Sequence, residues 1–232
     1  MTTMPDHARP DCVPRIVFLD LDDTLLNGNS GSMFVKFLLK RGEIGWYEAA
    51  RALYYVFGYK LNVIDFEQVS AKLVADYRGM REDALVDQCL EWFDEMVKHR
   101  FYDEALALLE EHRQAGDRLV LLTASTVYAA KPIAEHLGVD KYIATRLEVD
   151  NGVFTGRFDG PLCFGGGKVH WARRYLADAG LEHALGSAAF YTDSITDLPM
   201  LEVVQDPQVV NPDPLLAREA KRRGWPVRRF VR

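Results

Sequence analysis

The sequence predicts an α/β protein with a doubly wound parallel sheet and an inserted all-helical domain. Three short, nearly all-apolar runs at residues 16–21, 119–122 and 188–191 are typical of strands buried on both faces, as in a parallel sheet. Segments with apolar residues at helical spacing separate these runs. Because strands and helices alternate in this way, the sequence favours a Rossmann-like arrangement.

The remaining elements are predicted by weaker patterns. Further strands are expected at residues 143–149, 153–158, 209–210 and 227–231. Asp150, Asn151 and Gly152 separate two of them, and an Asn-Gly pair accepts the positive φ angles of a hairpin turn. Helices are predicted at residues 102–115 and 168–179, because each apolar periodicity ends just before a glycine, Gly116 or Gly180.

Residues 32–100 depart from this alternation. They have helical periodicity throughout and no strong strand, which predicts an insert of about four helices. The 232 residues are therefore expected to divide into an α/β core at 14–31 and 101–232, a helical cap at 32–100, and a flexible segment at 1–13. The insert is rich in aromatic residues, which we expect to pack inward. They are Trp46, Tyr47, Tyr54, Tyr55, Phe57, Tyr59, Phe66, Tyr77, Trp92 and Phe93.

Composition limits the possible partners. A formal net charge of −6 argues against a protein that coats nucleic acid. The only basic cluster, at residues 221–223 and 228–232, is expected to be a solvated helix end and an edge strand. The longest apolar stretch, residues 49–57, is interrupted by Arg51 and is too short to span a bilayer, so membrane contact is not expected.

The cysteines and the N-terminal residues predict a cytoplasmic protein. Cys12, Cys89 and Cys163 are odd in number and far apart, which favours neither a disulfide framework nor a zinc site. Residues 1–14 are polar, contain three prolines and lack the apolar core of a signal peptide.

Two groups of polar residues follow the first two predicted strands. Asp20, Asp22 and Asp23 come at the carboxyl end of the first strand, where open α/β sheets place their ligands. Alternate residues of a strand point the same way, so Asp20 and Asp22 can face one site, and crowded carboxylates require a counter-ion such as magnesium. Thr123 and Ala124 come at the end of the second strand, where a hydroxyl and main-chain amides suit an anion.

Two more groups lie further along the chain. Three glycines, residues 165–167, precede Lys168 and allow the backbone to approach a ligand closely. This segment is not a P-loop, because Val169 stands where the Walker pattern requires Ser or Thr. Asp193 and Asp197, four residues apart, follow the third buried strand. Each group taken alone has a structural explanation, and an acid after a strand is often a helix cap. Such explanations would have to hold for all four groups at once.

These four groups resemble the motifs of the haloacid dehalogenase-like hydrolase superfamily. The family order is Asp-x-Asp-x-Thr after strand one, Thr or Ser after strand two, Lys before a helix, and an acid pair after a later strand. The helical insert resembles the cap of the phosphoserine phosphatase-like subgroup. The tail from Val210 to Pro226 also resembles bacterial members that are assigned as histidinol-phosphate phosphatases.

The resemblance implies a role for each motif residue. Asp20 would be the nucleophile and a magnesium ligand, and Asp22 would be the general acid and base with its main-chain carbonyl on the metal. Thr123, Ala124 and Lys168 would bind the transferred phosphoryl group. Asp193 would complete the metal site, with Asp197 and Ser194 in support. The side chain of Asp23 is given no role, and His170 is expected at the surface or behind the site.

The implied activity is magnesium-dependent hydrolysis of a small phosphorylated metabolite through an aspartyl-phosphate. Asp22, which dehalogenases of the superfamily lack, favours phosphoryl transfer. A phosphotransferase or phosphomutase with the same nucleophile is the alternative enzyme, and an aspartate-phosphorylated signalling module or a binding protein without activity are alternatives of other classes. The chain would act as a monomer or a homodimer.

Asn29 bears on the substrate. By the resemblance it occupies the place of a glutamate that holds the substrate's amino group in phosphoserine phosphatases. An amide gives up a charge-assisted hydrogen bond of about 1.5–3 kcal/mol to that ammonium. The sequence therefore favours a phosphorylated amino alcohol such as histidinol phosphate over phosphoserine, with lipid-like phosphates third.

Overall fold

The computed structural model describes residues 14–60 and 66–231, with the backbone alone for residues 55–60, 66 and 67. At its centre is a six-stranded sheet in the order β3-β2-β1-β6-β7-β8, and every neighbouring pair is parallel. The strands are β1 (Ile16–Leu19), β2 (Arg118–Thr126), β3 (Lys141–Thr145), β6 (Ala189–Thr192), β7 (Asp206–Val210) and β8 (Val227–Arg228). The predicted parallel sheet is confirmed.

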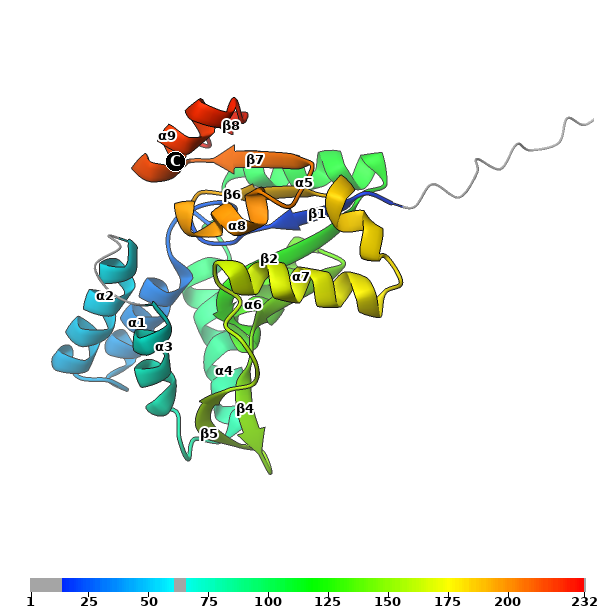
Figure 1. Ribbon diagram of the computed structural model, residues 1–232. Helices are drawn as coiled ribbons and strands as arrows, with labels where there is room; N and C mark the ends of the chain where they lie inside the picture. The colour runs from blue at the N-terminus through cyan, green and yellow to red at the C-terminus, as the bar shows by residue number, and fades with distance from the viewer. Residues whose placement is uncertain (1–13, 61–65, 232) are drawn as a thin grey trace, which may run out of the picture.

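Helices cover both faces of the sheet (Figure 1). One face packs against α5 (Asp103–Ala115) and α6 (Val127–Leu137), and the other against α7 (Gly166–Asp178), α8 (Leu198–Leu201) and α9 (Pro214–Arg223). The strand β1 is completely buried, and its side chains alternate between the two cores, with Val17 and Leu19 in one and Ile16 and Phe18 in the other. This two-sided burial explains the nearly all-apolar run and confirms the doubly wound class.

The predicted strand at residues 143–149 is wrong. The chain breaks at the exposed Arg146 into β3, which belongs to the large sheet, and β4 (Leu147–Asp150), which pairs only with β5 (Val153–Phe158) in a separate two-stranded hairpin. An apolar pattern does not mark where a chain leaves one sheet for another. The turn itself is as predicted, since Asn151 and Gly152 have φ angles of 48° and 77°.

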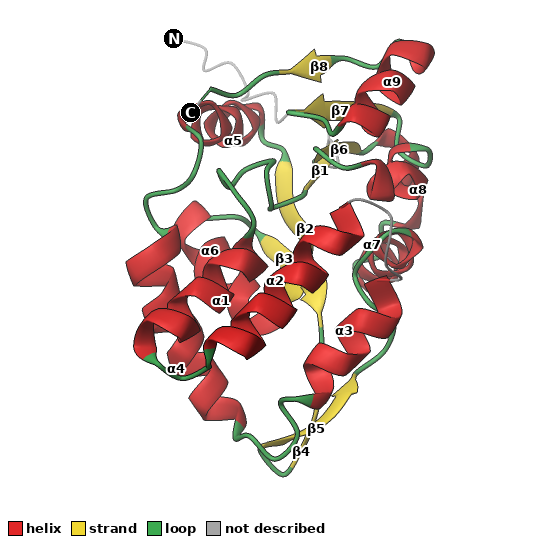
Figure 2. Ribbon diagram, turned by 90° about the vertical axis from the view of Figure 1, so that its left-hand side faces the viewer, coloured by secondary structure: helices red, strands yellow, loops and turns green. Residues whose placement is uncertain are grey.

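The insert contains four α-helices among its described residues. They are α1 (Ser30–Arg41), α2 (Trp46–Lys60), α3 (Phe66–Ala75) and α4 (Glu82–Trp92), and a single π-helical segment, η1 (Phe93–Val97), follows α4. Figures 1 and 2 show α1, α2 and α3 beyond the carboxyl ends of the strands. The division into cap and core at residues 32 and 100 stays a prediction.

Two of the contacts of the insert join it to the sheet core and to the hairpin. Trp92 and Val97 belong to the same buried cluster as Val17 of the sheet. The linker between α3 and α4 pairs with the hairpin, because the N–H of Glu82 donates to the carbonyl of Gly152 at 2.9 Å and the N–H of Gly79 to that of Phe154 at 3.0 Å. The hairpin, although it follows β3 in sequence, is thus bonded to the insert.

Some aromatic residues of the insert do not pack inward as predicted. Trp46, Tyr47 and Tyr54 are 81%, 80% and 63% exposed, whereas Trp92 and Phe93 are buried. Helical spacing alone does not determine which face meets a neighbour, and of residues 46–54 only Ala49 is buried. The side chains of Tyr55, Phe57, Tyr59 and Phe66 lie outside the described residues.

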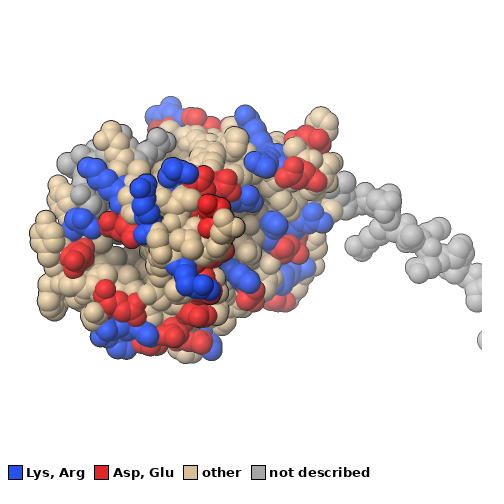
Figure 3. Space-filling model, turned by 90° about the horizontal axis from the view of Figure 1, so that it is seen from below, with Lys and Arg blue, Asp and Glu red and all other residues tan. Residues whose placement is uncertain are grey.

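Three further predictions concern the first residues, the cysteines and the membrane. The predicted flexible segment at 1–13, with Cys12, lies outside the described residues, while Cys89 and Cys163 are buried and unbridged. Within the part of the chain that the structure describes, no helix is long and apolar enough to cross a membrane. Acidic and basic side chains are interspersed over the face seen in Figure 3.

Candidate active site

The four sequence motifs meet at the carboxyl edge of the sheet. The N–H of Asp20, just after β1, donates to the carbonyl of Tyr191 on β6 at 2.9 Å, so the first and last motifs follow neighbouring parallel strands. A pocket of about 40 Å³ lies there. It is lined by Asp20, Asp22, Thr123, Ala124, Phe164, Lys168, Asp193, Ser194, Thr196 and Asp197. The structure therefore brings every predicted site residue to one place.

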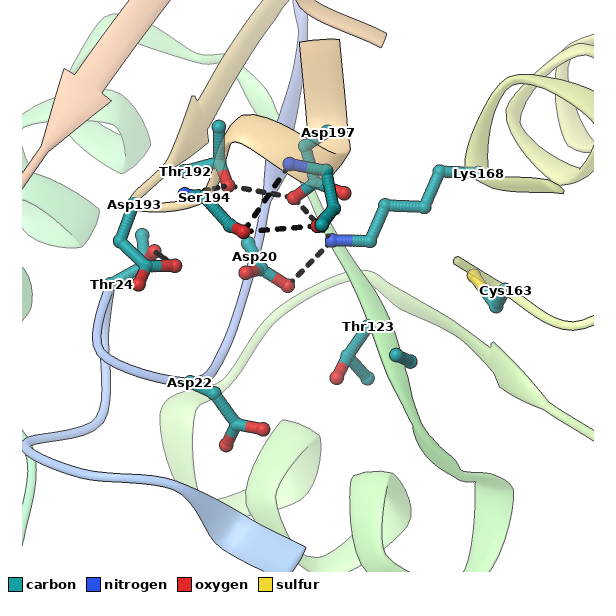
Figure 4. A network of polar contacts seen from close by, with 12 residues as sticks. Asp20, Asp22, Thr24, Thr123, Cys163, Lys168, Thr192, Asp193, Ser194 and Asp197 are labelled. Carbon is teal, nitrogen blue, oxygen red and sulfur yellow. Dashed lines mark hydrogen bonds and ion pairs between the residues drawn. The ribbon is translucent and has the colours of Figure 1, made fainter. Parts of the chain in front are cut away.

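Lys168 joins the first motif to the last (Figure 4). Its Nζ donates to Asp20 Oδ1 and to Asp197 Oδ2, both at 2.7 Å. Thr192 Oγ1 donates to the same Asp197 oxygen at 2.7 Å. All four side chains are buried, so these bonds form where water competes little.

Burial dominates the electrostatics of this cluster. Desolvation raises the pKa of Asp20 to about 7, against the opposing attraction of Lys168, and the nearby carboxylates of Asp197 and Asp22 raise it further. Desolvation alone would lower the pKa of Lys168, but Asp197 and Asp20 outweigh that effect, and the pKa of the lysine is raised. Lys168 therefore stays a cation throughout the physiological range.

The glycines before Lys168 are needed for its placement. A Cβ atom on Gly167 would lie 1.8 Å from the carbonyl oxygen of Leu162, a distance that no side chain tolerates. Gly165, at the N-cap of α7, has φ 51° and ψ −123°, a conformation open to glycine. The helix begins at Gly166, two residues before the predicted start, and so fixes Lys168 within its first turn.

Asp213 and Thr24 hold the loop that carries Asp193. The N–H of Asp213 donates to the carbonyl of Asp193 at 2.8 Å, and Asp213 Oδ2 accepts the N–H of Ile195 at 2.7 Å. Thr24 Oγ1 donates to Asp193 Oδ1 at 3.4 Å. Sequence reasoning missed Asp213, because an Asp before Pro214 looks like a helix N-cap, which it also is.

Asp22 contacts the start of α1. Asp22 Oδ1 accepts the N–H of Ser30 at 2.7 Å, and Oδ2 accepts the Ser30 hydroxyl and the Asn29 amide, both at 3.1 Å. The amide oxygen of Asn29 accepts the N–H of Ser32 at 2.8 Å and so caps α1. Both ends of the Asn29 amide are thus bonded within the protein. The sequence offered only the N-cap spacing from Asn29 to Ser32 as a sign of this.

Thr123 and Ala124 lie inside β2, which extends to Thr126, four residues beyond the prediction. Thr123 Oγ1 accepts the N–H of Ser125 at 3.1 Å, and the carbonyl of Ala124 accepts the Thr145 hydroxyl at 2.9 Å. These bonds fix the backbone where a phosphoryl group could meet main-chain amides. His170 is exposed, as predicted.

The oxygen donors at the pocket fit a hard cation. Four carboxylates and one lysine line the pocket, so the lining side chains carry a net charge of −3 when all are ionised. Asp20, Asp193 and the main-chain carbonyl of Asp22 could hold magnesium, which prefers oxygen ligands and retains several waters. Within the described part of the chain, no three Asp, Glu, His or Cys side chains are grouped closely enough to hold a metal ion by themselves. A cation here would therefore also use main-chain or water oxygens.

This fold, with acids at the ends of two neighbouring strands and a buried lysine between them, defines a class of α/β hydrolases. Residues 17–202 match the model of the haloacid dehalogenase-like hydrolase family, and the chain belongs to that family.

Curated relatives are similar over nearly the whole chain. An "Inhibition of morphological differentiation protein" of Streptomyces azureus is 36% identical over 93% of this chain and 78% of its own length. Phosphoserine phosphatase SerB1 of Mycobacterium tuberculosis is 31% identical over 97% and 74%. A histidinol-phosphatase of Neisseria meningitidis is 29% identical over 93% and 98%.

Solved structures agree on the fold. A protein of unknown function from Bordetella pertussis superposes with a TM-score of 0.84 at 32% identity, over 93% of this chain and 98% of that one. A substrate-bound phosphoserine phosphatase superposes with a TM-score of 0.67 at 17% identity, over 90% and 91%. At that identity the second likeness concerns the fold alone.

Proposed function

We propose that this chain is a magnesium-dependent phosphomonoesterase that acts through an aspartyl-phosphate on Asp20. The observation that carries the proposal is the buried contact of Asp20 with Lys168 at a pocket built from all four motifs. The family is one of hydrolases, and two of the relatives described above are named as phosphatases, which supports the same reaction class.

The pocket can bind a phosphoryl group only if positive charges offset the repulsion from its carboxylates. A phosphate dianion about 4 Å from an ionised Asp20 is repelled by roughly 8 kcal/mol at an effective dielectric constant near 20. Lys168 offsets part of this repulsion from a fixed position. Magnesium, if held by Asp20, Asp193 and the carbonyl of Asp22, would supply two further positive charges against this repulsion.

The reaction consists of two successive displacements at phosphorus. One oxygen of Asp20 attacks phosphorus, the bond from phosphorus to the leaving oxygen breaks, and Asp22 gives that oxygen a proton. Water then attacks the phosphorus of the aspartyl-phosphate while Asp22 takes its proton, which releases phosphate and restores Asp20. The Thr123 hydroxyl, the main-chain amide of Ala124 and Lys168 hold the phosphoryl oxygens, with Asp197 and Ser194 in support.

We propose a phosphorylated amino alcohol, such as histidinol phosphate, as the substrate class. A groove of about 470 Å³ lies beside Val127 and Tyr128, which continue the chain from the site strand β2. Its lining includes the acids Glu82, Glu148 and Asp159 and the cation Arg146, and Glu148 also pairs with Arg157 at 2.7 Å. The slight excess of acid favours a cationic leaving group. Asn29 supplies no carboxylate for the ammonium of phosphoserine, which places phosphoserine second and lysophosphatidate third.

Phosphate release from a panel of monoesters tests this function. We expect kcat/KM with magnesium to rank histidinol phosphate above phosphoserine and lysophosphatidate, with phosphate released in the absence of any acceptor. Dependence on an added acceptor would indicate a phosphotransferase instead. A preference for phosphoserine would contradict the substrate class but not the reaction.

The nucleophile is tested by a matched pair of variants. Asp20→Asn should lose turnover by several orders of magnitude, because it removes the attacking oxygen anion. Asp23→Asn is the control, since Asp23 has a φ angle of 53° that Asn also accepts and is assigned no role in the reaction. An Asp20→Asn variant that retains a tenth of the wild-type kcat would refute the mechanism.

A further inference from the structure

We propose that Asn29, Ser30 and Ser125 are positioning residues that aim the carboxylate of Asp22 at the leaving oxygen. The inference rests on the proposed function, in which Asp22 protonates that oxygen. Ser125 directly follows Thr123 and Ala124 on β2, and Asn29 and Ser30 lie outside the four motifs, at the start of the first helix of the insert.

Hydrogen bonds engage both oxygens of Asp22. Ser30 contributes its main-chain N–H to Oδ1 and its hydroxyl to Oδ2, and Asn29 contributes its amide to Oδ2. Ser30 is 2% exposed, and the amide of Asn29 is itself fixed by the N–H of Ser32. Because donors of fixed position meet both oxygens, they set the rotation of the carboxylate plane as well as its location.

A second bond ties this arrangement to the strand of the phosphoryl-binding residues. The hydroxyls of Ser30 and Ser125 lie 2.6 Å apart, and the N–H of Ser125 donates to Thr123 Oγ1 at 3.1 Å. When Asp22 is ionised, it accepts the one proton of the Ser30 hydroxyl, and the Ser125 hydroxyl then donates to Ser30. The chain of bonds thus runs from Asp22 through Ser30 and Ser125 to Thr123.

The leaving group distinguishes this role from a structural one. A 4-nitrophenolate departs readily without a proton, whereas an alkoxide needs one, so a badly aimed Asp22 slows alkyl esters selectively. The parameter kcat/KM covers the steps through departure of the leaving group, and it therefore isolates this contribution from the later hydrolysis of the aspartyl-phosphate.

The experiment compares kcat/KM for 4-nitrophenyl phosphate and for the best alkyl phosphate of the panel. In Asn29→Ala and Ser125→Ala we expect the alkyl-to-aryl ratio to fall about 10- to 100-fold, part of the effect of a general acid. Ser125→Thr keeps the hydroxyl and should restore the ratio. Ser187→Ala is the control, because Ser187 is exposed and bonds only locally, to the carbonyl of Ala184.

Asp22→Asn tests the role of Asp22 itself, separately from the role of the residues that position it. In one outcome, Asp22→Asn loses kcat/KM selectively for the alkyl phosphate, but Asn29→Ala and Ser125→Ala lose it equally for both substrates. That outcome would overturn the positioning role and leave the proposed function intact. An Asp22→Asn variant without selectivity would overturn the role of Asp22 and the inference with it. Thermal unfolding of each variant identifies any loss that comes from misfolding.

Discussion

The ammonium of Lys168 bonds to the carboxylate of Asp20 at 2.7 Å, although 148 residues separate them along the chain. The parallel sheet makes this contact possible, because it brings the ends of β1 and β6 and the start of α7 to one edge. The side chains of Lys168 and Asp20 are 3% and 10% exposed, so their charges act on each other and on a bound phosphoryl group with little screening.

Metal removal should abolish activity. The pocket holds four carboxylates against one lysine, and a phosphoryl group cannot approach without more positive charge. We expect exhaustive EDTA treatment to stop phosphate release and added magnesium to restore it. Calcium should inhibit, since its looser coordination misplaces the attacking and leaving oxygens. The control is EDTA with excess magnesium, and full activity after chelation would be the contrary result.

The metal-free protein should lose stability as pH rises from about 4 to about 7. Burial raises the pKa of Asp20 to about 7 from an ordinary value of 3.8, so in this interval the folded state holds a proton that the unfolded state has lost. Ionised Asp20 is therefore unfavourable in the folded protein above pH 7.

The neutral variant Asp20→Asn should accordingly unfold at a higher temperature than the wild type at pH 8 in EDTA. The difference should shrink toward pH 4, where Asp20 is protonated in the folded state and increasingly so in the unfolded state. Melting curves at pH 4, 6 and 8 measure it. A difference that grows as pH falls would contradict the raised pKa.

Gly167→Ala should disrupt the site. Its Cβ atom would overlap the carbonyl oxygen of Leu162, so the start of α7 must shift. Overpacking of this kind costs about 1–3 kcal/mol, and a displacement of Lys168 by about 1 Å lowers kcat/KM roughly 100-fold. Gly166→Ala is the matched control, because its Cβ atom would meet nothing within 4 Å. Equal behaviour of the two variants would show that the close approach is unimportant.

The insert is expected to move as a lid when a phosphoryl group binds. Its entering and leaving segments lie side by side, since Leu26 and Phe101 form an antiparallel bridge and the N–H of Asn27 donates to the carbonyl of Arg100 at 2.7 Å. Motion of the lid should strain this pair of segments. Hydrogen exchange with and without fluoroberyllate should change around Gly31 and Phe101. Unchanged protection at both places would argue against a moving lid.

Much of the fold could be predicted because burial on both faces leaves an unmistakable pattern. The short run Ile16 to Leu19, followed by acids, is typical of a strand buried on both faces, and it is one. The site followed from the fold, because parallel strands present their carboxyl ends at one edge and so bring Asp20 and Asp193 together.

What escaped prediction depends on contacts between distant segments. After the break at Arg146, β4 pairs with β5 in a hairpin that is bonded to the insert. No local sequence pattern predicts this pairing. The exposure of Trp46 and Tyr47 reflects how little of α2 meets a neighbour. The bonds from Asn29 and Ser30 to Asp22 could not be predicted. An Asn at a helix N-cap looks the same in the sequence whether or not its side chain also bonds to a residue of the active site.

Trapping of the phosphorylated protein tests the central claim most directly. The wild type should be mixed with a 32P-labelled substrate and quenched in acid within a single turnover. One portion is counted for protein-bound 32P, and the other is reduced with borohydride, which converts an acyl phosphate to an alcohol and releases the phosphate. Peptide mass spectrometry should then locate the reduced side chain at Asp20, and Asp20→Asn should yield no labelled protein. Label on another residue, or complete turnover without any labelled protein, would contradict the account.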